Sequence, residues 1–414
     1  MFAVFSRYKH INWALADQTM VSGVNFLTGI LLARFLGLDE YGRFALAWMV
    51  VLFCSSIQQA AIIAPMMSFG ATRKVRGKPA YYAVVAAQEL LFSLLCSALL
   101  GLATILSAYF APDLGLQDLV WPLSAALFAF QLQDFLRRYF FSRNFGRLAF
   151  FNDAISYLGQ VSLLVPLFYF WQLNSALVLW IIAATSGAAV VVGIWSMDLQ
   201  TFSGKRLRRV AAIHLSHSKW LVASALSQWT SGNFFIVTLG ATLGSEAVGA
   251  IRAVQNVLGV THVIFMGMEN IIPASVAKCL KSGGVSAVKA YIARATWFCM
   301  GGTAFYCLIV AVNPEAVLRF LFGQTYSGYG YLLWWYVPVY LLMSVGLPLR
   351  SGLRAFNDVR PIFSANLLAS VLAIAAASWF IEQWGVKGAI AGLISTQIVI
   401  QGYTYNALRK RLII

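Results

Sequence analysis

The sequence predicts an all-α integral membrane protein with twelve transmembrane helices in two similar halves. Composition gives the first reason, because 60% of the 414 residues are hydrophobic and only 11% are charged. The hydrophobic residues also come in runs of about 20, the length that a helix needs to cross a bilayer. Finally, one short motif occurs twice, at an offset of half the chain, which indicates an internal repeat.

Each hydrophobic run is interpreted as one membrane-spanning helix, because most runs have no polar face that a soluble helix would turn toward water. The predicted spans are 12–36, 44–69, 81–108, 119–141, 148–170, 175–196, 218–242, 248–272, 295–313, 331–349, 362–381 and 388–407. The first run is long enough to span and has no A-x-A-like cleavage site, so no cleavable signal peptide is expected.

The repeated motif is Leu-Gly-x-acid-x-x-Gly, found at residues 36–42 and again at residues 243–249. Each copy lies between two hydrophobic runs, so each is predicted to form the tight turn of the first hairpin in its half. The repeat predicts three domains: an N-terminal six-helix bundle at 1–197, a cytoplasmic basic linker helix at 198–217 and a C-terminal six-helix bundle at 218–414. The motif itself is expected to bind nothing.

Positive charge predicts the orientation of the chain. Lys and Arg cluster in alternate loops, and the clusters include Arg7, Arg73, Lys74, Arg76, Arg137, Arg138, Arg143, Arg147, Arg206, Arg208, Arg209, Lys278, Lys281, Arg354 and Arg409. By the positive-inside rule these loops and both termini are cytoplasmic. The net charge of +16 therefore reflects topology and attraction to anionic bilayer lipids, and no nucleic acid partner is expected.

The loops argue against an enzyme. The predicted outside loops are short, and none of them pairs carboxylates or offers a Ser/His/Asp set, while the cytoplasmic loops contain no glycine-rich nucleotide-binding motif. The five cysteines form no CxxC pattern, so neither disulfides nor a metal site is indicated. No cofactor is expected.

Carboxylates inside the spans are the candidates for coupling transport to an ion, because charges in lipid are unfavourable and tend to face a cavity or a partner. They are Glu89, near the middle of span three, Asp17 in span one and Glu269 in span eight. A carboxyl at the depth of Glu89 could load and release a proton near neutral pH; a static hydrogen-bond role is the alternative. Asp134 is predicted to pair with Arg138 one turn later, with Asp153 as a possible third member.

Substrate contacts are predicted from arginines and amides close to or within the spans. Arg34 and Arg252 lie toward the outside, and a guanidinium binds phosphate oxygens bidentately, as a lipid-linked pyrophosphate would require. Snorkelling to the interface is the alternative for both. Asn25, Gln58 and Gln255 add polar groups to the predicted interior.

Two prolines are candidate gating residues. Pro65 and Pro273 lie near the ends of spans two and eight, 208 residues apart, which nearly matches the repeat. Proline frees a backbone carbonyl and permits a bend, as a helix that rocks during transport would need. Termination of a helix at the membrane edge explains them equally well.

The stretch from Leu31 to Gly42, Leu-Leu-Ala-Arg-Phe-Leu-Gly-Leu-Asp-Glu-Tyr-Gly, resembles the first-hairpin signature of bacterial polysaccharide transporters. This family belongs to the multidrug/oligosaccharidyl-lipid/polysaccharide exporter superfamily and includes the O-antigen flippases. The segments Gly249–Asn256 and Leu321–Tyr326 resemble the start of the family's eighth span and the loop before its tenth. The resemblance implies two six-helix bundles around a central cavity, and it draws attention to Arg34 and Arg252.

The expected function is therefore a flippase that moves undecaprenyl-diphosphate-linked oligosaccharide across the inner membrane by alternating access, for exopolysaccharide or O-antigen biosynthesis. Its partners would be the lipid-linked oligosaccharide, bilayer lipids and other polysaccharide-assembly proteins. A cation-coupled multidrug antiporter of the same superfamily remains open. A membrane-embedded glycan polymerase or ligase is disfavoured by the short loops. A major facilitator ranks lower, because the loop after span two has no acidic residue.

Overall fold

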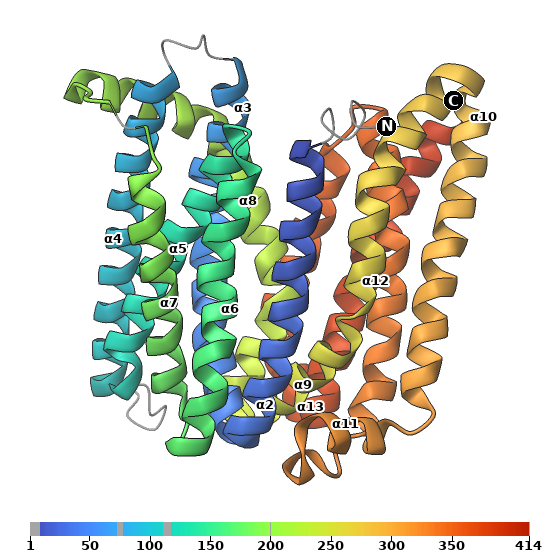
Figure 1. Ribbon diagram of the computed structural model, residues 1–414. Coiled ribbons are helices and arrows are strands. Elements are labelled where there is room, and N and C mark those ends of the chain that lie inside the picture. Colours follow the sequence, from blue (N-terminus) through green and yellow to red (C-terminus); the bar gives the residue numbers. More distant parts are fainter. Residues whose placement is uncertain (1–8, 73–77, 111–116, 199, 414) are drawn as a thin grey trace. The chain divides into compact units, whose positions relative to one another are not determined.

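The structure, a computed structural model, describes residues 9–72, 78–110, 117–198 and 200–413. Within these ranges every regular element is a helix (Figure 1). The α-helices are α2 (Lys9–Gln58), α3 (Ala64–Thr72), α4 (Lys78–Phe110), α5 (Val120–Ser142), α6 (Gly146–Phe170), α7 (Ser175–Trp195), α8 (Gly204–Leu243), α9 (Ser245–Leu258), α10 (Thr261–Ala311), α11 (Pro314–Phe322), α12 (Tyr331–Ala355) and α13 (Arg360–Ile413). The predicted basic residues Arg7, Arg73, Lys74 and Arg76 lie outside the described residues.

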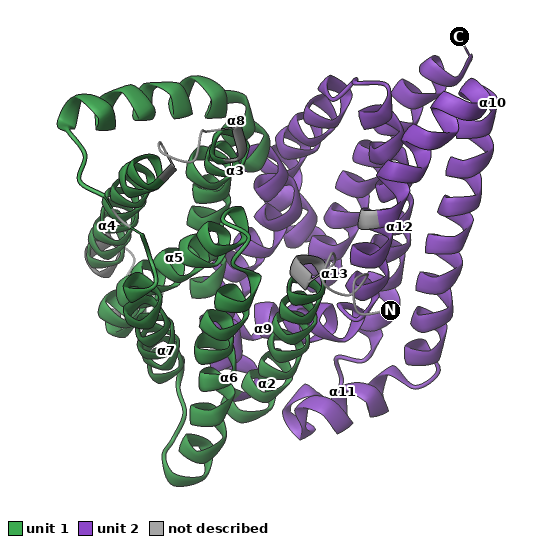
Figure 2. Cartoon of the chain, turned by 45° about the horizontal axis from the view of Figure 1, so that its top comes forward, with its two compact units in different colours: residues 1–36, 47–225 green, residues 37–46, 226–414 purple. Residues whose placement is uncertain are grey.

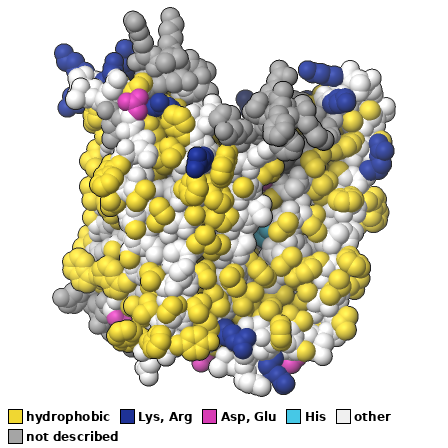
Figure 3. All heavy atoms as spheres, viewed as in Figure 1, with side chains coloured by type: hydrophobic (Ala, Val, Ile, Leu, Met, Phe, Trp, Pro, Cys, Tyr) yellow, Lys and Arg dark blue, Asp and Glu magenta, His cyan; other side chains and the backbone are white. Residues whose placement is uncertain are grey.

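Seven helices in the described part of the chain are long and apolar enough to cross a membrane. Three of them are each two helices joined at a glycine with positive φ: α2 at Gly37, α10 at Gly284 and α13 at Gly385. An L-residue with a side chain rarely adopts this conformation, so these glycines allow the chain to turn between consecutive spans. On the face shown in Figure 3, hydrophobic side chains cover the sides of the helices.

Predicted spans four and seven fall on α5 and α8, which are not among the seven helices. Their polar residues lower the hydropathy, among them Asp134 and Arg137 in α5 and Gln228 and Asn233 in α8. These two helices therefore need neighbours that satisfy the polar groups, and α5 provides the main polar cluster described below.

The chain divides into two compact units (Figure 2). Unit 1 contains residues 1–36 and 47–225, and unit 2 contains residues 37–46 and 226–414. The division lies within α8, which is continuous from Gly204 to Leu243. The basic stretch that was predicted as a separate linker helix is thus the first part of the helix that carries span seven. The turn between the first two spans belongs to unit 2, although the spans on both sides of it belong to unit 1.

The two copies of the repeated motif contact each other within unit 2. Their first glycines, Gly37 (φ 76°, ψ −176°) and Gly244 (φ 83°, ψ −179°), have nearly the same backbone conformation. Their second glycines meet the opposite copy: a Cβ on Gly42 would overlap the carbonyl oxygen of Ser245, and a Cβ on Gly249 would overlap that of Leu38. The contact is therefore reciprocal, as a local two-fold relation between the copies requires.

Side chains reinforce this crossing of the two turns. Ser245 Oγ donates a hydrogen bond to Asp39 Oδ1, the acidic position of the first copy. Tyr326, in the turn after α11, donates its hydroxyl to the carbonyl oxygen of Gly37 at 3.4 Å. Burial raises the pKa of Tyr326, so its hydroxyl stays protonated and remains a donor. The first glycine of each motif makes the turn as predicted. The second glycine is needed because a side chain there would collide with the backbone of the other copy.

A further pair of equivalent positions supports the two-fold design. Asn144, between α5 and α6, and Asn357, between α12 and α13, are the two non-glycine residues with positive φ in the described ranges, at 60° and 55°. Asparagine tolerates this conformation better than most residues because its short side chain can hydrogen-bond locally. Each ends the fourth span of its half.

Candidate functional site

The main polar cluster of unit 1 joins α2 to the consecutive helices α5 and α6, which follow much later in the sequence. Arg137 of α5 lies between Asp17 of α2 and Asp153 of α6: its Nη2 is 2.6 Å from Asp17 Oδ2, and its Nε is 2.8 Å from Asp153 Oδ2. Both carboxylates are fully buried and the guanidinium nearly so. Gln133 Nε2 donates to Asp153 Oδ1 at 2.7 Å. We call Asp17, Arg137 and Asp153 the carboxylate–arginine triad.

The charges of the triad do not balance. Two carboxylates face one guanidinium, so the fully ionised cluster carries one excess negative charge in a buried site, and such a charge is unfavourable unless it is compensated. Asp17 Oδ1 is buried and makes no hydrogen bond. The triad can therefore accept a proton or a monovalent cation without becoming positively charged.

The triad differs from the predicted pairing. Asp134 does approach Arg138, at 3.5 Å, as the spacing of four residues predicted. Asp153, however, pairs with Arg137 and not with the Asp134–Arg138 pair, because the consecutive residues Arg137 and Arg138 lie on different faces of α5 and only Arg137 is on the buried one. The sequence interpretation treated Arg137 as one of the charges that set topology, and it missed its role inside unit 1.

Glu89 is at the centre of a second buried cluster. Its Oε1 accepts hydrogen bonds from Gln58 Nε2 and Ser93 Oγ, each at 2.8 Å. Gln58 Nε2 also donates to the carbonyl oxygen of Gln131, at 2.8 Å. Glu89 Oε2 is buried without a hydrogen-bond partner. Since buried polar atoms are almost always paired in folded proteins, such a cluster is where a proton, water or ligand is expected.

The Glu89 cluster adjoins an irregular segment of span two. A π-helical turn, Gln59–Ile63, separates α2 from α3, and such turns are frequent at functional sites. Gln59 Nε2 donates to Asp134 Oδ2. Pro65 follows directly and has no N–H to donate to Ala61, four residues earlier. The Oγ of Ser218 in α8 lies 3.1 Å from that carbonyl oxygen and 2.6 Å from the carbonyl oxygen of His214, so its one hydrogen is shared between the two.

In unit 2, Arg252 forms a hydrogen bond with Gln255, and two tyrosines form hydrogen bonds with Gln255 in turn. Its Nη1 donates to Gln255 Oε1 at 2.7 Å, while Gln255 Nε2 donates to the hydroxyl of Tyr336. The hydroxyl of Tyr340 donates to the carbonyl oxygen of Gln255 at 3.2 Å. The titratable groups that act on Arg252 within the described residues are Tyr41, Tyr336 and Tyr340, so no carboxylate there neutralises it. Its Nη2 is buried without a hydrogen-bond partner.

Three of the other predicted site residues lie at the surface of the structure. Arg34, Asn25 and Glu269 have exposed side chains. Pro273 is half-buried in α10, which runs through it as a continuous helix. The structure thus groups Gln58 with Glu89, Arg252 with Gln255, and Asp17 with two residues that were not on the predicted list.

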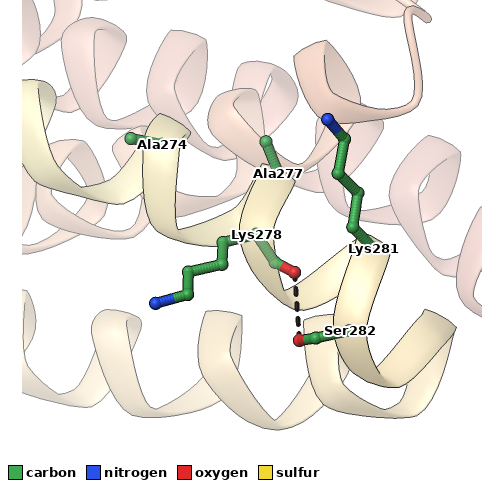
Figure 4. Close-up of a pocket in the computed structure, with 5 residues that line it drawn as sticks. All are labelled: Ala274, Ala277, Lys278, Lys281 and Ser282. Carbon is green, nitrogen blue, oxygen red and sulfur yellow. Dashed lines mark hydrogen bonds between the residues drawn. The ribbon is translucent and has the colours of Figure 1, made fainter.

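A recess lies on the surface of α10. It has a volume of about 440 Å³ and is lined by Ala274, Ala277, Lys278, Lys281 and Ser282. Figure 4 shows that the two lysine ammonium groups point away from each other, while Ser282 Oγ donates to the carbonyl oxygen of Lys278 at 3.1 Å. Its lining comes from a single helix, so this surface offers no convergent set of polar groups.

Comparison with known proteins identifies structures of similar fold. Residues 221–379 match the model of the MatE family. No curated protein sequence matches the chain. Among solved structures, an inward-facing multidrug resistance MATE family transporter of the MOP superfamily is similar over 94% of each chain, with a TM-score of 0.73 and 12% identity.

Two further structures have the same architecture. The lipid II flippase MurJ, in an inward closed conformation, is similar with a TM-score of 0.66 and 12% identity over 96% of this chain and 87% of its own. A MATE transporter of Vibrio cholerae is similar with a TM-score of 0.55 and 16% identity, over 100% of this chain and 98% of its own. These identities show the fold alone. The chain therefore shares the fold of these structures, and the predicted fold class of pseudo-symmetric helical bundles is confirmed.

Proposed function

We propose that the protein is a flippase for undecaprenyl-diphosphate-linked oligosaccharide in the bacterial inner membrane, with both termini in the cytoplasm. The observation that carries the proposal is Arg252, a half-buried guanidinium whose Nη2 has no hydrogen-bond partner and which, among the described residues, has tyrosines and no carboxylate acting on it. An uncompensated buried cation favours an anionic ligand, and guanidinium groups suit phosphate oxygens. Arg252 would hold the diphosphate while the lipid tail stays in the bilayer.

Translocation would be coupled to an ion through unit 1. The carboxylate–arginine triad has one excess negative charge, and Glu89 offers a second carboxyl with a free oxygen. Either can change its charge by taking up a proton, and the triad can also take up a monovalent cation. The π-helical turn beside Gln58 is a place where such a change would alter the path of span two.

The decisive experiment is transport by the purified protein in vesicles. Wild-type protein should move a fluorescent lipid-linked oligosaccharide between leaflets, and Arg252→Ala should reduce the rate at least about tenfold, since a hydrogen bond to a charged group contributes about 1.5–3 kcal/mol. Arg319→Ala, which alters an arginine of α11, is the matched control and should retain transport. Unchanged transport by Arg252→Ala would refute the proposal for this residue.

Glu89→Gln tests the coupling. Glutamine can still accept the hydrogen bonds from Gln58 and Ser93, so the protein should keep its stability and its basal transport. Transport should no longer respond to an imposed pH gradient, because the amide cannot ionise. A variant that responds like the wild type would exclude Glu89 as the coupling group and leave the triad as the candidate.

A multidrug antiporter is the second candidate function, supported by the MatE match and by the similarity to a multidrug resistance transporter. Arg252 argues against it for cationic drugs, which a nearby positive charge would repel. A deletion strain separates the two: loss of surface glycan without drug sensitivity supports the flippase, and the opposite result supports the antiporter. Chain extension by purified protein in vitro would instead indicate a glycan polymerase or ligase.

A further inference from the structure

Two unpaired hydrogen-bond donors lie one helical turn apart on α9. Arg252 Nη2 and Asn256 Nδ2 are both buried, and neither has a hydrogen-bond partner. Residues four apart on a helix lie on the same face, with Cβ atoms about 5–6 Å from each other. Asn256 therefore adds a second N–H donor on the face of α9 that carries the unbalanced guanidinium.

The neighbouring residues fix Arg252 so that one nitrogen remains available. Gln255 binds Nη1 at 2.7 Å, and Tyr336 in turn holds the Gln255 amide. Tyr336 is almost completely buried, which limits the movement of this chain of hydrogen bonds. The guanidinium is consequently oriented in advance of binding, and this lowers the entropic cost of holding a ligand.

At the break between α9 and α10, backbone carbonyl groups are paired by nearby side chains. The helix ends at Leu258 and resumes at Thr261, which leaves carbonyl groups without their usual partners. Tyr306 donates its hydroxyl to the carbonyl oxygen of Val257 at 2.8 Å, and Thr261 donates to that of Leu258 at 2.7 Å. Side chains thus satisfy the irregular backbone, whereas the donors of Arg252 and Asn256 stay unpaired.

We propose that Arg252 Nη2 and Asn256 Nδ2 form a two-donor site for a diphosphate group, with Asn256 as a binding residue in its own right. The inference deepens the proposed function and rests on it. A charged donor and a neutral donor on one face suit two anionic oxygens of one ligand, and a diphosphate presents such oxygens on neighbouring phosphoryl groups. Asn256 confers a preference for diphosphate over a single phosphate, because a diphosphate can place an oxygen of each phosphoryl group on a separate donor.

The test is calorimetric binding of farnesyl diphosphate and inorganic phosphate to the full chain in detergent. The wild type should bind the diphosphate, and Asn256→Ala should weaken that binding roughly tenfold or more while changing binding of inorganic phosphate much less. Asn233→Ala is the matched control, because Asn233 is also half-buried but already donates to the carbonyl oxygen of Trp229 at 3.0 Å. It should bind like the wild type.

Asn256→Asp is the sharper variant. A carboxylate at this position would pair with Arg252, so diphosphate binding should fall roughly a hundredfold while the melting temperature in detergent rises. A variant that merely disturbed folding would lose both binding and thermal stability. Diphosphate binding within twofold of the wild type for both Asn256 variants would overturn the two-donor site.

The outcomes separate this inference from the proposed function. If Arg252→Ala loses diphosphate binding while both Asn256 variants keep it, the two-donor site fails and Arg252 stands alone. If all three variants behave as expected but reconstituted wild-type protein moves no lipid-linked oligosaccharide, the site holds and the flippase proposal fails.

Discussion

The crossing of the two repeated turns permits a quantitative test with one methyl group. In Gly249→Ala the new Cβ would overlap the carbonyl oxygen of Leu38 and lie 3.2 Å from the backbone nitrogen of Gly42. Both obstacles are main-chain atoms, so no side-chain rotation can relieve the overlap. The two turns must separate, or the helices that carry them must shift.

The expected loss of stability follows from this geometry. Overpacking in well-packed sites typically destabilises by about 1–3 kcal/mol, and a rigid backbone obstacle places Gly249→Ala at the upper end, about 3 kcal/mol. For a chain of 414 residues, the usual unfolding entropy per residue converts this to a fall in melting temperature of roughly 3 °C. Gly42→Ala should behave alike, because its Cβ would overlap the carbonyl oxygen of Ser245.

Thermal denaturation of purified protein in detergent is the assay, with Gly232→Ala as the control. Gly232 is in α8, and a Cβ there would have no neighbouring atom within 4 Å. The control should melt at the same temperature as the wild type or slightly higher, since alanine favours a helix over glycine by about 1 kcal/mol. If Gly249→Ala melts with the control, the backbone contact does not exist as described.

The double variant examines the reciprocity of the contact. Once the first methyl has separated the turns, the second meets less obstruction, so the combined loss should be clearly smaller than the sum of the two single losses. Strict additivity would mean that the two glycines occupy independent sites.

The remaining predictions concern unit 1. Arg137→Leu leaves Asp17 and Asp153 buried without their cation, so it should destabilise the folded protein by about 3–5 kcal/mol or prevent its accumulation in the membrane. Adding Asp17→Asn and Asp153→Asn to this variant should restore much of the protein yield in detergent extracts. Ser218→Ala removes the donor to the Ala61 carbonyl and should lower stability by about 1 kcal/mol in thermal denaturation. In a Pro65→Ala background, where an N–H is again present in span two, the same change should have a smaller effect; an equal effect would refute the link to Pro65.

Local patterns in the sequence were enough to predict the helices and some of their side-chain pairs. The Asp134–Arg138 contact follows from a spacing of four residues, and the turns at Gly37 and Gly244 follow from glycine beside hydrophobic runs. The fold class was predicted for the same reason, since bilayer thickness fixes the length of each run. None of these predictions needs to know which helices are neighbours.

The carboxylate–arginine triad could not be predicted in this way. Asp17 and Arg137 are separated by 120 residues, and their pairing depends on how α2 and α5 are rotated about their axes. A single sequence has no periodicity that fixes those rotations when most faces of a helix are apolar. One available signal was Arg137 itself, because a charge within a helix otherwise long enough to span is expected to have a buried partner.

The placement of residues 37–46 in unit 2 has a consequence for biosynthesis. The first hairpin of the chain is made early, but the turn against which it packs follows about 200 residues later. At a synthesis rate of roughly 5–20 residues per second, the second turn is made on the order of 10–40 seconds after Gly42. An N-terminal half produced alone would present this unmatched surface, and a separately produced C-terminal half would lack the segment that fills it. Two co-expressed fragments, residues 1–225 and 226–414, should therefore bind each other through the turn at residues 37–46.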